Sequence, residues 1–116
     1  MPPDARTYLW HILSASDAIA RFVEGMDADR YAASEMVYSA VERKFEIIGE
    51  ALGQLSRLDP TLAARVPDVR RIIAFRNILI HGYASIEHIR VWETAEGSLP
   101  ALRKTITALL DELGPL

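Results

Sequence analysis

The sequence predicts an all-α fold, an antiparallel, up-and-down bundle of four to five helices that dimerises through its helices. Apolar residues recur at helical spacing along nearly the whole chain, and no segment shows the alternation of a half-buried strand. The chain has 116 residues, half of them hydrophobic, which suits a single domain spanning residues 1–116. Cysteine is absent, so disulfides, cysteine-ligated metal sites and thiol nucleophiles are excluded.

The first two expected helices have recognisable start and stop signals. Asp4 is the expected N-cap of the first, and Gly25 stands where that helix should end. A polar connection over residues 27–29 leads to the second helix, which Asp59-Pro60 stops. The two inward stripes are Leu9, Ile12, Ser16, Ile19 and Val23, and then Val37, Ala40, Val41, Phe45, Ile48, Ala51, Leu52 and Leu55.

Three further helices are expected in the second half of the chain. The third follows Pro67, with Asp68 as its cap, and ends at Gly82. The fourth is capped by Ser85 and is interrupted at Gly97, where the last helix takes over. Their inward stripes are Val69, Ile72, Ile73, Leu79 and Ile80; Ile86, Ile89 and Trp92; and Leu99, Leu102, Ile106, Leu109 and Leu113.

Gly49 and Gly53 lie on one face of the second expected helix, four residues apart. Each costs about 1 kcal/mol relative to alanine in a helix. We favour the interpretation that another backbone approaches closely here, within the chain or across a dimer; tolerated packing slack is the alternative.

Charge is distributed unevenly along the chain. The formal net charge of −3 argues against generic nucleic-acid binding. Between residues 65 and 90, however, five arginines stand against one aspartate and one glutamate, which gives this window a charge of +3. A basic segment in an acidic chain predicts a focused anion site. We expect no membrane segment and no signal peptide, and therefore a cytoplasmic protein.

The residues best suited to chemistry lie between Arg76 and Tyr83. The planar, permanently charged guanidinium of Arg76 matches phosphate oxygens, and the imidazole of His81 can exchange a proton near neutral pH. Together they are the minimum for metal-free cleavage of a phosphodiester. Asn77 precedes His81 by four residues, so it would lie on the same side and hydrogen-bond the imidazole or contact substrate.

In an ideal α-helix the side chains of Arg76 and His81 cannot point at the same atom, because residues five positions apart lie roughly 140° apart around the helix axis. Unwinding at Gly82, a bent arginine side chain or a site built across a symmetric dimer would bring them together, and we favour the dimer. The structural alternative is that Arg76, on an inward stripe, pairs with Glu50 or Glu46 and that His81 caps carbonyls.

Other polar residues suggest weaker candidates. Glu42, Glu46 and Glu50 form an acidic row, for which a solvated face or arginine partners are favoured over a metal site. His88 is expected on the surface or as a secondary RNA contact, and His11 is expected to be structural. Four aromatic residues are expected in the core or at a dimer contact: Tyr8, Trp10, Tyr31 and Tyr38.

Two segments resemble HepT toxins of the HEPN superfamily over about residues 9–110. The order Arg-x4-His-x-Tyr at Arg76, His81 and Tyr83, with Ile86 and Val91-Trp92 after it, is similar to the family signature. The stretch 42–51, ending in Ile-Gly-Glu-Ala, is similar to the other family marker. The chain departs from its relatives at residues 69–71, where Val-Arg-Arg stands in place of a tryptophan that such proteins often carry.

The resemblance implies a dimer that brings two motifs to one cleft and cleaves RNA without metal or cofactor, through the ribose 2′-hydroxyl. Such a protein would be the toxin of a type II or type VII toxin–antitoxin system. Arg76 would stabilise the scissile phosphate, and His81 would be the acid and base. Asn77, Arg70 and Arg71 would be supporting, substrate-binding residues.

The resemblance also implies a partner, a nucleotidyltransferase antitoxin that adds AMP to Tyr83. The added charge and bulk beside Arg76 would repel RNA. The chain itself lacks an Asp-x-Asp pair after Gly97-Ser98 and is not expected to be that transferase. The alternative function is a non-catalytic helical module that binds a nucleotidyltransferase, a nucleotide or RNA.

Overall fold

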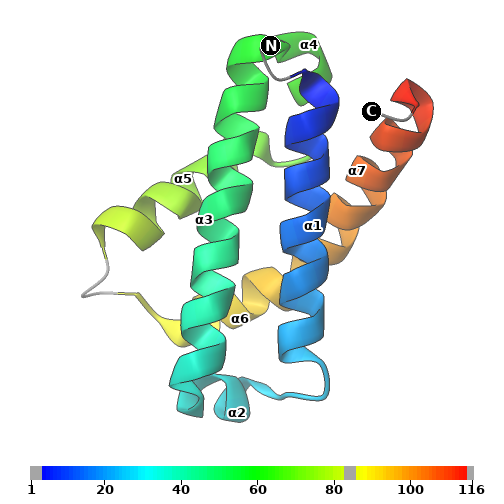
Figure 1. Ribbon diagram of the computed structural model, residues 1–116. Coiled ribbons are helices and arrows are strands. Elements are labelled where there is room, and N and C mark those ends of the chain that lie inside the picture. Colours follow the sequence, from blue (N-terminus) through cyan, green and yellow to red (C-terminus); the bar gives the residue numbers. More distant parts are fainter. Residues whose placement is uncertain (1–3, 83–85, 115–116) are drawn as a thin grey trace.

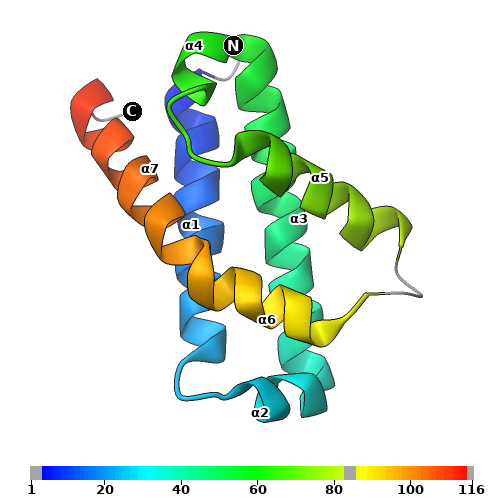
Figure 2. The same cartoon turned by 180° about the vertical axis from the view of Figure 1, so that it is seen from behind.

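The chain folds into helices joined by short connections (Figures 1 and 2). The computed structural model describes residues 4–82 and 86–114, and this part of the chain contains seven helices and no strand. They are α1 (Ala5–Val23), α2 (Ala28–Ala33), α3 (Glu35–Leu58), α4 (Pro60–Ala63), α5 (Val69–His81), α6 (His88–Gly97) and α7 (Leu99–Leu113). The all-α prediction is confirmed, and the five longer helices correspond to the five expected from the sequence.

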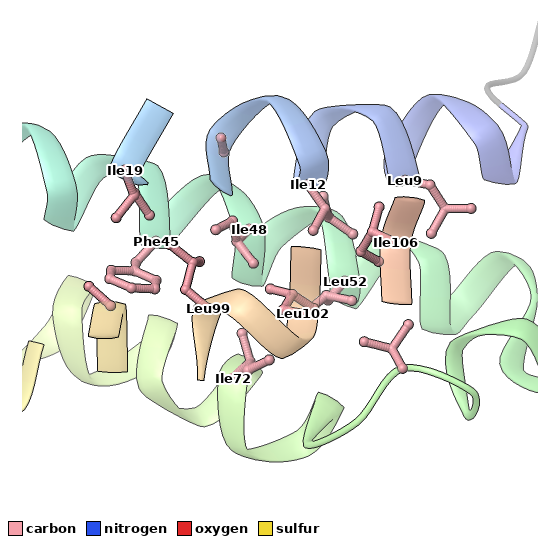
Figure 3. Packing of buried hydrophobic residues seen from close by; sticks show 14 of the residues in the cluster. Leu9, Ile12, Ile19, Phe45, Ile48, Leu52, Ile72, Leu99, Leu102 and Ile106 are labelled. Carbon is pink, nitrogen blue, oxygen red and sulfur yellow. The ribbon is translucent and has the colours of Figure 1, made fainter. Parts of the chain in front are cut away.

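The hydrophobic core is built on the antiparallel pair α1 and α3, against which α7 and α5 pack. Each of these helices contributes an apolar stripe, because side chains at i, i+3, i+4 and i+7 share one face. Burying one leucine or isoleucine contributes roughly 1.5–3 kcal/mol. Figure 3 shows how the stripes meet, including the side chains of Leu9, Ile12, Ile48, Leu52, Leu102 and Ile106.

One polar residue in the predicted stripe of α1 is fully buried. Ser16 has no exposed surface, and its hydroxyl donates a 2.7 Å hydrogen bond to the carbonyl oxygen of Ile12. A buried hydroxyl is tolerated when it is hydrogen-bonded in this way. Ser16 therefore belongs to the inward face, as its spacing predicts.

Two short helices replace what the sequence suggests are connections and stops. The Asp27 carboxylate accepts a hydrogen bond from the Arg30 backbone N–H at 2.8 Å, so residues 27–29 begin α2 and are not a plain polar connection. Asp59 accepts from the Leu62 N–H at 3.1 Å and begins α4. Each aspartate caps the first turn by satisfying an unpaired N–H.

The N-cap predictions have mixed outcomes. Asp4 caps α1 by accepting a hydrogen bond from the Arg6 backbone N–H, as expected. Asp68 occupies the N-cap position of α5, but its backbone is left-handed, with φ of 59°, and its side chain makes no capping hydrogen bond. Ser85 lies outside the described residues, and Glu87 is the residue that precedes the first turn of α6.

The inward stripe predicted around α6 is correct in part. Ile86 and Trp92 are half-buried and pack against the core, but Ile89 is 47% exposed. The buried residues of α6 are Val91 and Ala95, which the predicted stripe does not contain. Leu113, expected inward at the end of α7, is also exposed. No helix in the described ranges is both long and apolar enough to span a membrane.

Candidate functional site

Helix α5 (Figure 2) carries most of the residues expected to act on a substrate. Its two faces differ in exposure. One face packs on α3 through buried Ile72 and Leu79, and through Phe75, whose ring meets Phe45 edge-on at 5.3 Å. The opposite face is exposed to solvent. It carries Arg70, Arg71, Ala74, Asn77, Ile78 and His81.

Arg76 leaves α5 beside α3 and is held there by two side chains. Its Nη2 forms an ion pair with Oε2 of Glu50 on α3 at 2.9 Å. Its Nη1 donates a hydrogen bond to Oδ1 of Asn77 at 3.0 Å. The Nε is buried with no partner, yet the side chain as a whole is 28% exposed. Arg76 is therefore oriented by protein groups, while part of its side chain remains in contact with solvent.

The stem of Arg76 lies against Gly49 on α3. A Cβ added at Gly49 would overlap the Cβ and Cγ of Arg76, so no side chain fits there. A Cβ at Gly53 would meet only the terminal nitrogens of Arg57, at ordinary contact distances of 3.8 and 3.9 Å. The predicted close approach is confirmed at Gly49, where the backbone Cα of Arg76 lies 3.6 Å from the added Cβ, behind the arginine stem. No other backbone of the described residues approaches Gly53 in this way, and an approach across a dimer stays a prediction.

Arg76 and His81 are not brought together within one chain. Helix α5 remains helical through His81, and Gly82 is its C-cap. The helix therefore ends after His81, and a change of backbone direction at Gly82 does not reorient the imidazole. Arg76 turns toward α3 rather than toward His81. The ion pair with Glu50 is the structural alternative expected from the sequence, and a site shared by two copies stays a prediction.

Asn77 and His81 differ from what their four-residue spacing suggests. The side-chain oxygen of Asn77 accepts from Arg76, so Asn77 supports the guanidinium and not the imidazole. His81 is exposed at the end of α5, and its ring has no hydrogen-bond or ion-pair partner among the described residues. An exposed imidazole can exchange protons with a bound molecule. Tyr83, the third motif residue, lies outside the described residues.

A groove of about 530 Å³ lies beside this helix, between α5 and α6, and the sequence did not indicate it. Its floor is apolar, with Phe45 and Ile48 of α3 and Leu102 of α7. Its rim carries charges of both signs: Asp68, Arg71, Glu87, Arg90 and Glu93. Arg71, expected to touch substrate, therefore stands at the rim of this groove.

The acidic row on α3 has arginine partners at two of its three positions. Glu50 pairs with Arg76, and Glu46 pairs with Arg43 at 3.6 Å. Within the described ranges no group of three acidic or histidine side chains is placed to hold a metal ion. Arginine partners, one of the interpretations favoured from the sequence, account for Glu46 and Glu50.

The third member of the row, Glu42, belongs to a half-buried cluster with His88. Burial raises the pKa of the Glu42 carboxyl, the nearby Glu46 carboxylate adds to the rise, and His88 opposes it. The His88 ring stacks on Tyr38, with centroids 4.0 Å apart, and meets Tyr31 edge-on. The expectation of a surface His88 is wrong, because α6 packs its first turn against α2 and α3 side chains.

The remaining aromatic and histidine predictions divide between core and surface. Tyr31 is fully buried, and burial raises the pKa of its hydroxyl. Trp10 is exposed on α1, where its ring meets that of His11 edge-on at 6.2 Å. Trp10 is therefore not a core residue, and a dimer contact there stays a prediction.

Comparison with known proteins supports the resemblance seen in the motif. A family model described as ribonuclease HepT-like matches residues 12–109. A protein of Methanocaldococcus jannaschii named "Putative RNase" is 29% identical, over 95% of this chain and 94% of its own. A protein of the same name in Caldanaerobacter subterraneus is 30% identical, over 92% of this chain and 95% of its own.

A third relative carries the family name itself. A "Probable ribonuclease HepT" of Thermococcus cleftensis is 28% identical, over 84% of this chain and 88% of its own. No solved structure is a significant match to the chain.

Proposed function

Because the chain belongs to the ribonuclease HepT-like family of the HEPN superfamily, we propose that it is a metal-independent endoribonuclease. It acts in the cytoplasm as a single-domain toxin, and a nucleotidyltransferase antitoxin neutralises it. The observation that carries the proposal is a guanidinium, Arg76, which Glu50 and Asn77 orient in a side chain that is 28% exposed, on the same helix as the exposed imidazole of His81.

The proposed reaction uses the ribose 2′-hydroxyl as nucleophile. His81 takes the proton of that hydroxyl, and the oxygen attacks the adjacent phosphorus. Arg76 stabilises the negative charge that builds on the phosphate oxygens as the fifth bond forms. The bond to the 5′-oxygen then breaks, that oxygen is protonated, and a 2′,3′-cyclic phosphate remains. The protonated His81 supplies this proton, so one imidazole serves as base and then as acid.

The proposed homodimer completes the site that one chain leaves open. Ile78, an apolar side chain that is 58% exposed, lines the groove between α5 and α6, and α6 exposes a second apolar side chain, Ile89. The mixed charges on the groove rim are self-complementary, because a two-fold axis sets each residue of one copy against the same patch of the other. Such a dimer would face the two α5 helices toward each other and set Arg76 of one copy near His81 of the other.

The remaining site residues have supporting roles in this proposal. Arg70 and Arg71, exposed in the first turn of α5, contact RNA phosphates away from the cleaved bond. Asn77 holds the Arg76 fork. Tyr83 is the hydroxyl to which the antitoxin transfers AMP, which blocks the phosphate position with a negative charge. No cofactor or metal ion takes part.

A second function is favoured by one observation, the ion pair between Arg76 and Glu50. An arginine whose task is to tie α5 to α3 needs no substrate, and the chain would then be a non-catalytic module that binds a nucleotidyltransferase, a nucleotide or RNA. The two functions differ in what happens to RNA.

Incubation of purified protein with total RNA in EDTA separates them. The ribonuclease proposal expects cleavage by the parent protein and a loss of roughly 10²-fold or more in His81→Ala and Arg76→Ala. His11→Ala, which removes an exposed histidine on α1, is the matched control and should cleave normally. RNA left intact by the parent protein, or cleaved as fast by His81→Ala, would exclude the proposed mechanism.

A further inference from the structure

We propose that Glu50 is a resident counter-ion on Arg76 that an RNA phosphate displaces, so that Glu50 sets the affinity of the site for its substrate. This inference rests on the ribonuclease function proposed above and adds a residue that determines how tightly that site binds.

The contact itself places the carboxylate where a phosphate oxygen would bind. Nη2 is one of the two terminal nitrogens of the Arg76 fork, and Oε2 of Glu50 lies 2.9 Å from it. Carboxylate and phosphate oxygens bind the guanidinium fork in the same way, through charge-assisted hydrogen bonds. A phosphate that uses both terminal nitrogens therefore competes with Glu50 for Nη2.

Glu50 is the movable partner of this pair. Its side chain is 53% exposed, and its Oε1 accepts a long hydrogen bond of 3.4 Å from Nε2 of Gln54. Exposed ion pairs of this kind hold weakly, since water and salt compensate both charges. The carboxylate can turn into solvent at little cost.

Arg76 is the fixed partner. Its stem lies in the space left by the absent side chain of Gly49, and its Nη1 is held by Asn77 at 3.0 Å. Neither contact involves Glu50. When the carboxylate leaves, the guanidinium keeps its place, and its full positive charge becomes available to the incoming phosphate.

The same helix offers a matched control. Glu46 lies one turn before Glu50 on α3 and carries the same charge, but it pairs with Arg43 and not with Arg76. Glu46→Gln removes the same net charge from the same region of the protein, but it leaves the ion pair between Glu50 and Arg76 in place. A general change in surface potential would affect both variants alike, whereas displacement at Arg76 affects Glu50→Gln alone.

The test is the affinity for a short, fluorescein-labelled single-stranded RNA of mixed sequence, measured by anisotropy in the full-length His81→Ala protein, which the proposed function expects not to cleave the probe. Glu50→Gln should bind roughly two- to fivefold more tightly than its parent, the gain expected from one exposed ion pair. Glu46→Gln should show a clearly smaller change. In an Arg76→Ala background, Glu50→Gln should lose its gain. Circular dichroism of each variant checks that the fold is kept.

The outcomes separate this inference from the function on which it rests. Unchanged or weaker binding by Glu50→Gln, an equal gain in Glu46→Gln, or a gain that persists without Arg76 overturns the counter-ion role and leaves the ribonuclease proposal standing. If neither the parent nor any variant binds RNA, both are overturned.

Discussion

The stem of Arg76 lies on the backbone of Gly49, so close that the glycine has no room for a side chain. This contact joins the two segments that resemble the family markers, one on α3 and one on α5. It sets where the guanidinium stands relative to Glu50, the next residue of α3. The position of the candidate catalytic arginine therefore depends on the absence of a methyl group on the neighbouring helix.

Gly49→Ala should destabilise the protein by about 1–3 kcal/mol, because the new Cβ overlaps the Arg76 stem and one of the two helices must shift. It should also lower RNA cleavage, since the guanidinium is displaced. Unfolding by urea measures the first effect, and cleavage assays measure the second.

Gly53→Ala is the matched control on the same helix. Its Cβ would meet only the flexible end of Arg57, so the usual preference of helices for alanine should prevail, with a gain of about 0.5–1 kcal/mol. Equal effects of the two substitutions would contradict the contact described at Gly49.

The long helices could be predicted from the sequence because their stripes are long. α1, α3 and α7 each repeat the apolar spacing over several turns, which leaves little doubt about the inward face. The short helices α2 and α4 were missed, because Asp27 and Asp59 read equally well as turn residues. Around α6 the predicted Ile86 and Trp92 do pack against the core, but the buried pair Val91 and Ala95 could not be singled out, because ten residues give too few apolar repeats to define one face.

The site could be predicted in its residues but not in its contacts. Spacing along one helix suggested that Asn77 supports His81, whereas its oxygen binds Arg76. The pair of Arg76 with Glu50 was one of two structural alternatives, and only the packing of α5 on α3 selects it over Glu46. Contacts between helices depend on how the helices are placed relative to each other. Helical periodicity indicates which face of each helix is buried, but it does not give that placement.

The half-buried carboxyl of Glu42 should make stability depend on pH. Its pKa in the folded protein is raised, chiefly by burial, so folding favours the protonated form. That contribution is present in full below the ordinary glutamate pKa of about 4.3 and is lost as the pH rises through the higher folded value. At neutral pH the ionised carboxylate therefore costs stability.

Glu42→Gln should raise the free energy of unfolding at pH 7, because the neutral amide avoids the desolvation of the carboxylate, and the gain should shrink toward pH 4. Urea unfolding at several pH values measures it. Glu96→Gln, on the exposed surface of α6, controls for the loss of one negative charge. A gain that is absent at pH 7, or that grows on acidification, would contradict the raised pKa.

Incubation with ATP and a cognate nucleotidyltransferase should add AMP to Tyr83, an increase of about 329 Da with a new negative charge. Intact-mass spectrometry detects it, and Tyr83→Phe, which keeps the ring and lacks the hydroxyl, should stay unmodified. The modified protein should no longer cleave RNA. An active transferase that leaves the mass unchanged, or modifies Tyr83→Phe equally, would remove Tyr83 as the target.

The most direct test of the central claim mixes two inactive variants. Arg76→Ala and His81→Ala are each expected to be inactive, but if the site takes Arg76 from one copy and His81 from the other, a mixed dimer holds one intact site. After subunit exchange, equal amounts of the two should recover roughly a quarter of the parent cleavage rate, because half of the dimers are mixed and each has one working site of two. A mixture that remains as inactive as either variant alone would contradict a site shared between two copies.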